Sequence, residues 1–151
     1  MERAQETLGA LEQAGADPRL MALLCATYRI HRAEGSDYLD AIVGLEQCQN
    51  LPGYRVVGQA MLATAHMYAG HEAEYYRRLA KLNDSVPESW LDRVYKGFAQ
   101  VFGAPQEAVA TLREATRERS SPETEIILAR ALDTVASHSL QSTSSKRRER
   151  E

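Results

Sequence analysis

The run His71-Glu72-Ala73-Glu74 carries the residue types of a helical metal site. A zinc site of the His-Glu-x-x-His type needs a second imidazole four residues after the first, and Tyr75 occupies that position. We therefore interpret His71 and its neighbours as solvated residues at the start of a helix. The other histidines are isolated on separate predicted helices: His31, His66 and His138. No catalytic role is assigned to any of them.

Other motifs of catalysis are absent from the sequence. It contains no Gly-rich phosphate loop, no Gly-x-Ser-x-Gly elbow and no paired-Cys zinc pattern. Cys25 and Cys48 have no second Cys or His at ligand spacing, which favours small buried apolar groups over a disulfide or a metal site. We expect no enzyme activity, no cofactor and no metal.

Composition and charge limit the classes of partner. Of the 151 residues, 44% are hydrophobic and 26% charged, which is typical of a folded globular domain. The net charge of −3 lacks the basic field of a nucleic-acid-binding protein, so nucleic acid is not an expected partner. No apolar run approaches the roughly 20 residues of a membrane span, and the first six residues do not resemble a signal peptide. We expect a cytoplasmic protein without membrane insertion.

Glycine and proline divide the chain into segments whose apolar spacing is helical. Gly15 and Gly70 are placed as helix ends, whereas Pro18 and Pro87 are placed as helix starts. The sequence thus predicts eight helices, at about residues 1–14, 18–34, 37–50, 54–69, 72–82, 87–102, 105–116 and 122–137. From Ser139 on the side chains are almost all polar, so we divide the chain into a helical domain, 1–138, and a disordered polar and basic tail, 139–151.

The helices recur with a regular period. Segments that start near Pro18, Tyr54, Pro87 and Pro122 are offset by 36, 33 and 35 residues. A period near 34 with two helices per unit is typical of a solenoid, because a lone helix hairpin cannot cover both of its apolar faces. Neighbouring hairpins must therefore stack.

Individual residues within this period resemble the tetratricopeptide (TPR) family. Residues 102–115 are similar to the family's glycine turn followed by a second helix with alanines at fixed steps. A second segment repeats this pattern through Gly35, Tyr38, Ala41, Ile42, Leu45 and Cys48. The resemblance implies an all-α, TPR-like α-solenoid of about eight antiparallel helices in three to four hairpins.

The resemblance also implies a binding surface, since the first helix of each TPR hairpin lines the concave face. By this register the inward positions are Arg29, Val57, Ala60, Thr64, Met67, Tyr68, Trp90 and Arg93. Such a groove, apolar and aromatic with flanking arginines, suits the apolar stripe of a partner helix. The alternative is that Met67, Tyr68 and Trp90 complete the core between hairpins.

A narrower resemblance concerns residues 52–70 and 75–82, which are similar to small TPR-like proteins of bacterial type III secretion systems. In the needle-subunit chaperones of that group, the concave groove holds the amphipathic C-terminal helix of the needle protein. The resemblance implies a cytoplasmic chaperone that binds an amphipathic helical peptide. The alternative is a structural TPR scaffold, as a subunit of a larger assembly or as a homodimer.

Overall fold

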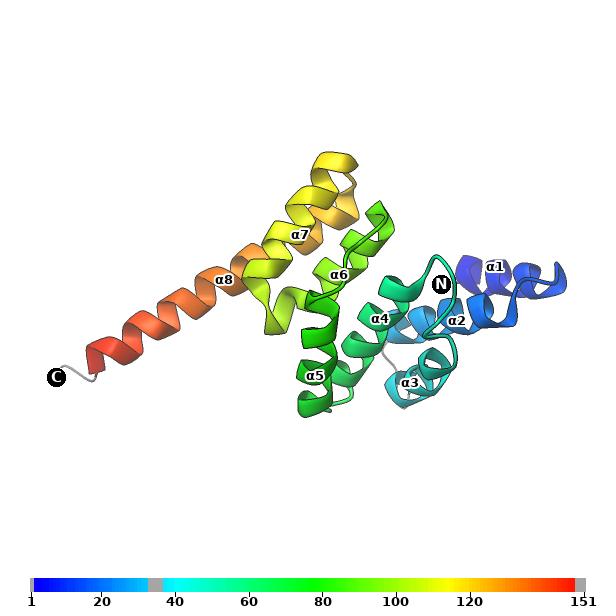
Figure 1. Ribbon diagram of the computed structural model, residues 1–151, viewed down its shortest axis with the longest axis horizontal. Helices are drawn as coiled ribbons and strands as arrows, with labels where there is room; N and C mark the ends of the chain where they lie inside the picture. The colour runs from blue at the N-terminus through cyan, green and yellow to red at the C-terminus, as the bar shows by residue number, and fades with distance from the viewer. Residues whose placement is uncertain (1, 33–36, 149–151) are drawn as a thin grey trace. The chain divides into compact units, whose positions relative to one another are not determined.

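A computed structural model describes residues 2–32 and 37–148, and these residues form eight helices and no strand (Figure 1). The helices are α1 (Glu2–Gln13), α2 (Pro18–Arg32), α3 (Asp37–Gln47), α4 (Arg55–Tyr68), α5 (Glu72–Asn83), α6 (Trp90–Gly103), α7 (Pro105–Glu118) and α8 (Pro122–Arg148). The predicted all-α class is confirmed. Within the described ranges, no helix combines the length and apolarity needed to cross a bilayer.

Several helix ends lie where the local sequence places them. Pro18 is the first residue of α2, and the carboxylate of Asp17 accepts the backbone N–H of Arg19 at 2.8 Å. Gly15 and Gly70 follow α1 and α4 with φ of +76° and +79°, a left-handed conformation that glycine adopts without a steric penalty. The predicted break at Gly35 lies outside the described residues.

The predicted start of the sixth helix at Pro87 is wrong, because α6 begins at Trp90. Ser89 and Asp92 form a capping box there. The Asp92 N–H donates to Ser89 Oγ at 3.1 Å, and the Ser89 N–H donates to Asp92 Oδ2 at 3.3 Å. These reciprocal bonds satisfy backbone donors of the first turn, and Pro87 precedes them in the connector.

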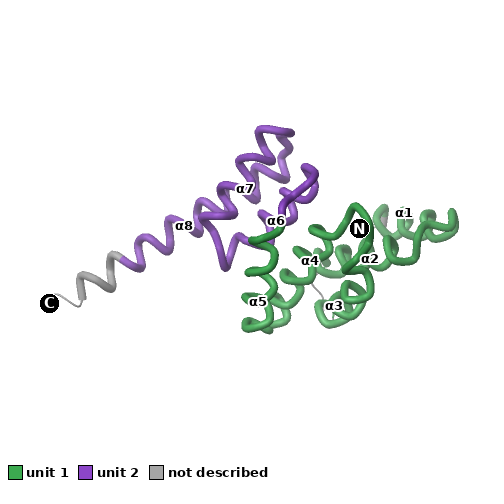
Figure 2. The backbone as a smooth tube through the Cα atoms, viewed as in Figure 1, with its two compact units in different colours: residues 1–85 green, residues 86–151 purple. Residues whose placement is uncertain are grey.

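The chain forms two compact units, residues 1–85 and 86–151 (Figure 2). In unit 1, α1 packs on α2, α2 on α3, α3 on α4 and α4 on α5, and α2 also contacts α4. Because α4 packs against three other helices, ten of its residues are buried. The largest fully buried apolar side chains of this unit are Leu45, Met61, Leu62 and Leu82.

Unit 2 contains α6, α7 and α8. Each of the three helices packs on the other two. Val101, Ala108, Val109, Leu112 and Ala131 form the buried core, and Ile127, Leu128 and Val135 of α8 pack against it.

The last helix is longer than the sequence pattern predicts. Its predicted end near Ser137 falls inside α8, which continues across residues 139–148 of the expected disordered tail. No glycine or proline interrupts residues 123–148. Hydroxyl groups also bond to carbonyls one turn back: Thr134 donates to Arg130 at 2.9 Å and Ser139 to Val135 at 3.0 Å. Residues 149–151 lie outside the described residues.

Candidate functional site

Three of the predicted groove positions are buried in α4. Val57 is 4% exposed, Ala60 is fully buried and Thr64 is 1% exposed. The Thr64 hydroxyl donates to the Ala60 carbonyl at 2.9 Å, so its polar group is satisfied within its own helix. These side chains pack inside the protein and present almost no area to a partner.

The other predicted positions of unit 1 reach the surface. Arg29 is exposed, and Met67 and Tyr68 are half-buried. The three residues occupy the last turns of α2 and α4, two helices that contact each other. The Tyr68 ring lies against the ring of Tyr38 from α3, with centroids 5.3 Å apart. We call Arg29, Met67 and Tyr68 the Tyr68 surface.

The predicted positions of unit 2 have partners near the end of α7. Trp90 Nε1 donates to the Arg119 carbonyl at 3.0 Å, and the Arg119 guanidinium lies 4.9 Å from the centroid of the indole ring. Arg93 Nη1 donates to Glu118 Oε2 at 2.8 Å. Trp90 and Arg93 therefore hold the start of α6 against the end of α7. That Trp90 also contacts a partner stays a prediction.

The structure shows exposed apolar side chains that the predicted groove does not include. In unit 1 these are Leu39, Val43 and Tyr76, which are 52%, 60% and 49% exposed. In unit 2 the outward face of α8 carries five exposed apolar residues at steps of three or four: Ile126, Ala129, Leu132, Ala136 and Leu140. We call these five the outer stripe of α8. The spacing was readable from the sequence, but exposure was not.

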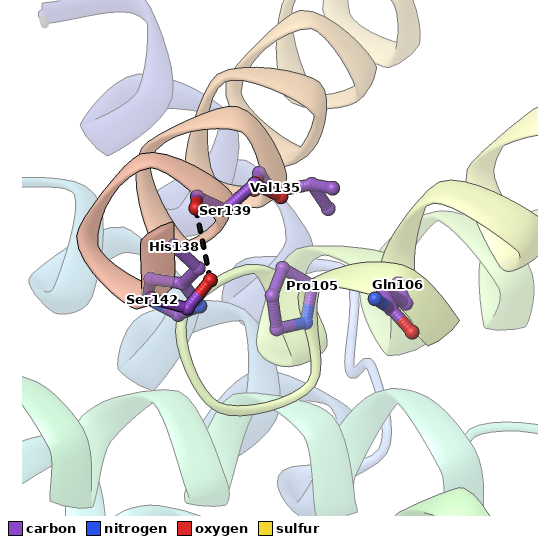
Figure 3. Close-up of a pocket in the computed structure, with 6 residues that line it drawn as sticks. All are labelled: Pro105, Gln106, Val135, His138, Ser139 and Ser142. Carbon is purple, nitrogen blue, oxygen red and sulfur yellow. Dashed lines mark hydrogen bonds between the residues drawn. The ribbon is translucent and has the colours of Figure 1, made fainter. Parts of the chain in front are cut away.

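A cavity of about 230 Å³ lies between the start of α7 and the second half of α8 (Figure 3). Its lining comprises Pro105, Gln106, Val135, His138, Ser139 and Ser142. The Ser142 hydroxyl donates to the Ser139 carbonyl at 2.9 Å, as the dashed line shows. In this geometry the serine bonds to backbone and not to the imidazole of His138, so the arrangement is not that of a base-activated nucleophile.

A polar contact outside the predicted set joins His66 and His71. Their Nδ1 atoms lie 3.1 Å apart, and their ring centroids 5.3 Å apart. The sequence interpretation placed His66 alone on its helix and treated His71 as a solvated residue at a helix start, so it did not pair them. They meet because the turn at Gly70 folds α5 back along α4. Among the described residues, no group of three His, Cys, Asp or Glu could hold a metal ion.

Comparisons with known proteins give no identification. No family model, curated protein or solved structure matches the chain.

Proposed function

We propose that the chain is a TPR-like helical-repeat module that binds the amphipathic helix of another protein. One observation carries the proposal: each unit contains three consecutive helices with the same set of contacts. In unit 1 the set α2, α3 and α4 has consecutive helices in contact, and the first also contacts the third. In unit 2 the set α6, α7 and α8 has the same contacts. Contact between alternate helices is expected of stacked hairpins, because each repeat packs on its neighbour.

The Tyr68 surface is the proposed site of contact in unit 1. Met67 offers an adaptable apolar side chain and Tyr68 a rigid ring with a polar end, two properties that suit the side chains of an amphipathic helix. Arg29 complements acidic residues that flank the apolar stripe of such a helix. Within this proposal the chain is a cytoplasmic chaperone that shields the helix of a needle-like secretion subunit.

The test is capture of the partner from the native host by the tagged protein and by two variants. We expect the unaltered chain to retain a small protein at one-to-one stoichiometry and Met67→Ala/Tyr68→Ala to lose it. Tyr76→Ala, which removes an exposed ring from α5, is the matched control and should retain it.

The affinity for a synthetic peptide of the partner's amphipathic helix then tests whether the Tyr68 surface binds that helix. Loss of the Met67 and Tyr68 side chains should weaken peptide binding by about tenfold or more, as measured by calorimetry. Equal affinity of the double variant and the control would reject the Tyr68 surface. A captured partner without an amphipathic helix would reject the proposed ligand.

The outer stripe of α8 favours a second function, that of a structural scaffold. Ile126, Leu132 and Leu140 are 62%, 43% and 70% exposed on one helix. Exposed apolar side chains at helical spacing are typical of a face that packs against another helix. In this alternative the chain is a subunit of a homodimer or of a larger assembly, without chaperone activity.

A further inference from the structure

We propose that His66 and His71 form a pH-sensitive latch that closes the turn between α4 and α5 and opens it in mildly acidic solution. His66 lies in the last turn of α4 and His71 is the N-cap residue of α5. The His71 backbone N–H donates to the His66 carbonyl at 2.9 Å, and the two Nδ1 atoms are 3.1 Å apart. Backbone and side-chain bonds therefore join the same two residues across the turn.

The latch depends on how many protons the pair carries. An Nδ1···Nδ1 contact of 3.1 Å is a hydrogen bond when one nitrogen bears a proton and the other is bare. A pair with one added proton retains that bond, because the imidazolium donates to the neutral ring. A pair with two added protons sets two N–H groups against each other and has no acceptor between them. The second protonation therefore breaks the latch.

The surroundings of His66 oppose its protonation. The residue is only 7% exposed, and its Nε2 atom is buried without a hydrogen-bond partner among the described residues. An imidazolium at this position would bury a second N–H donor with no acceptor. Burial, and then the nearby positive charge of Arg78, lower the pKa of His66, and the charge of His71 acts in the same direction.

Charged groups on the neighbouring helices set the field at the latch. Two carboxylates raise the pKa of His66: Glu74 on α5 and Glu46 on α3. Both are paired with Arg78, which lies 2.6 Å from Glu74 and 3.5 Å from Glu46. A hydrogen bond from Arg77, aided by the charge of Arg78, lowers the pKa of Glu74 to about 2, so Glu74 stays ionised throughout the range in which imidazoles titrate. The last turn of α2, which also packs on α4, carries Arg29, His31 and Arg32.

The direction of the pH effect follows from the lowered pKa of His66. The folded chain binds fewer protons at this residue than the unfolded chain, so the contribution to stability is complete above the ordinary pKa of 6.5. It is lost as the pH falls from that value through the lowered pKa of the folded state. Between the two pKa values the unfolding equilibrium constant should rise by at most about tenfold for each unit by which the pH falls. Opening of the latch releases the start of α5, where Tyr75 is buried and its N–H bonds to the His71 carbonyl.

The test measures urea unfolding from about pH 8 to about pH 5 for the full chain, in chelator-treated buffer. We expect stability to fall below about pH 6.5 in the unaltered protein and in His138→Gln, which removes an exposed imidazole of α8. His66→Gln should remove most of this fall, and His71→Gln should reduce it, because it removes the charge that opposes protonation of His66. An unchanged pH slope in both of these variants would overturn the latch. A slope that appears only when chelator is omitted would assign the pair to a metal ion and would also overturn it.

Nitrogen NMR of the imidazoles gives a second readout that needs no substitution of the pair. We expect His66 in the unaltered chain to titrate below the ordinary range, and the amide signals of residues 70–75 to change with it. If His66→Gln does not fold, this titration and the His71→Gln slope decide the matter. A His66 that titrates in the ordinary range, without a change in the turn amides, would reject the proposal.

Discussion

At the scale of single residues, Gly97 determines how closely α6 and α7 approach. A Cβ atom at this position would lie 2.5 Å from Leu112 Cγ and 2.6 Å from Leu112 Cδ2. Leu112 is fully buried in the core of unit 2, so it has little space into which to move. We predict that Gly97→Ala lowers the free energy of unfolding by about 1–3 kcal/mol, as measured by urea unfolding.

The matched control for this prediction is Gly9→Ala in α1. A Cβ atom at Gly9 meets nothing within 4 Å. Alanine has the higher helix propensity, so this change should leave the stability unaltered or raise it by up to about 1 kcal/mol. Gly97→Ala with a stability equal to that of Gly9→Ala would contradict the close contact of α6 with α7.

At the scale of a helix, the start of α6 depends on its capping box. Ser89→Ala removes the acceptor of the Asp92 N–H and should lower the free energy of unfolding by about 1 kcal/mol. Pro87→Ala changes the residue that the sequence pattern places at the helix start, and we expect it to cost less than Ser89→Ala. Thermal melts of the two variants check this order. A larger loss for Pro87→Ala would support a helix that begins at the proline.

The face of α7 that packs against α6 and α8 gives a second prediction at this scale. Ala108 is fully buried in the core of unit 2, whereas Ala110 on the same helix is exposed. Ala108→Glu places an unpaired carboxylate among apolar groups and should lower the free energy of unfolding by about 3 kcal/mol or more. Ala110→Glu should change it by less than about 0.5 kcal/mol. Urea unfolding measures the free energy of unfolding of both variants. Similar losses of stability would show that the buried face of α7 is assigned incorrectly.

At the scale of the whole molecule, the outer stripe of α8 predicts self-association if the chain is a scaffold. Light scattering after size exclusion should then show a dimer or larger species for the unaltered protein. Ile126→Glu/Leu140→Glu should show a monomer, because burial of two carboxylates against apolar groups opposes packing. The control, Leu39→Glu, charges an exposed position of α3 and should not change the mass. A monomeric unaltered protein at high concentration would exclude the homodimer.

The sequence alone determined where helices form and, except for α8, roughly how long they are. Asp17 and Pro18 start α2, and Gly15 and Gly70 end α1 and α4, because capping bonds and left-handed φ angles depend on residues within a few positions. The Ser89 cap was equally local, and it was missed because Pro87 offered a competing start signal. The periodic apolar pattern predicted the all-α class for the same reason: it reports the geometry of one helix at a time.

Only the tertiary structure decided which side chains are accessible. Val57 and Thr64 share a stripe of α4 with Tyr68, yet two are buried and one is half-buried. Periodicity assigns residues to a face, whereas burial depends on how far neighbouring helices extend along that face. The contact between His66 and His71 also belongs to the tertiary structure, because it requires two helices to be folded against each other across a glycine turn.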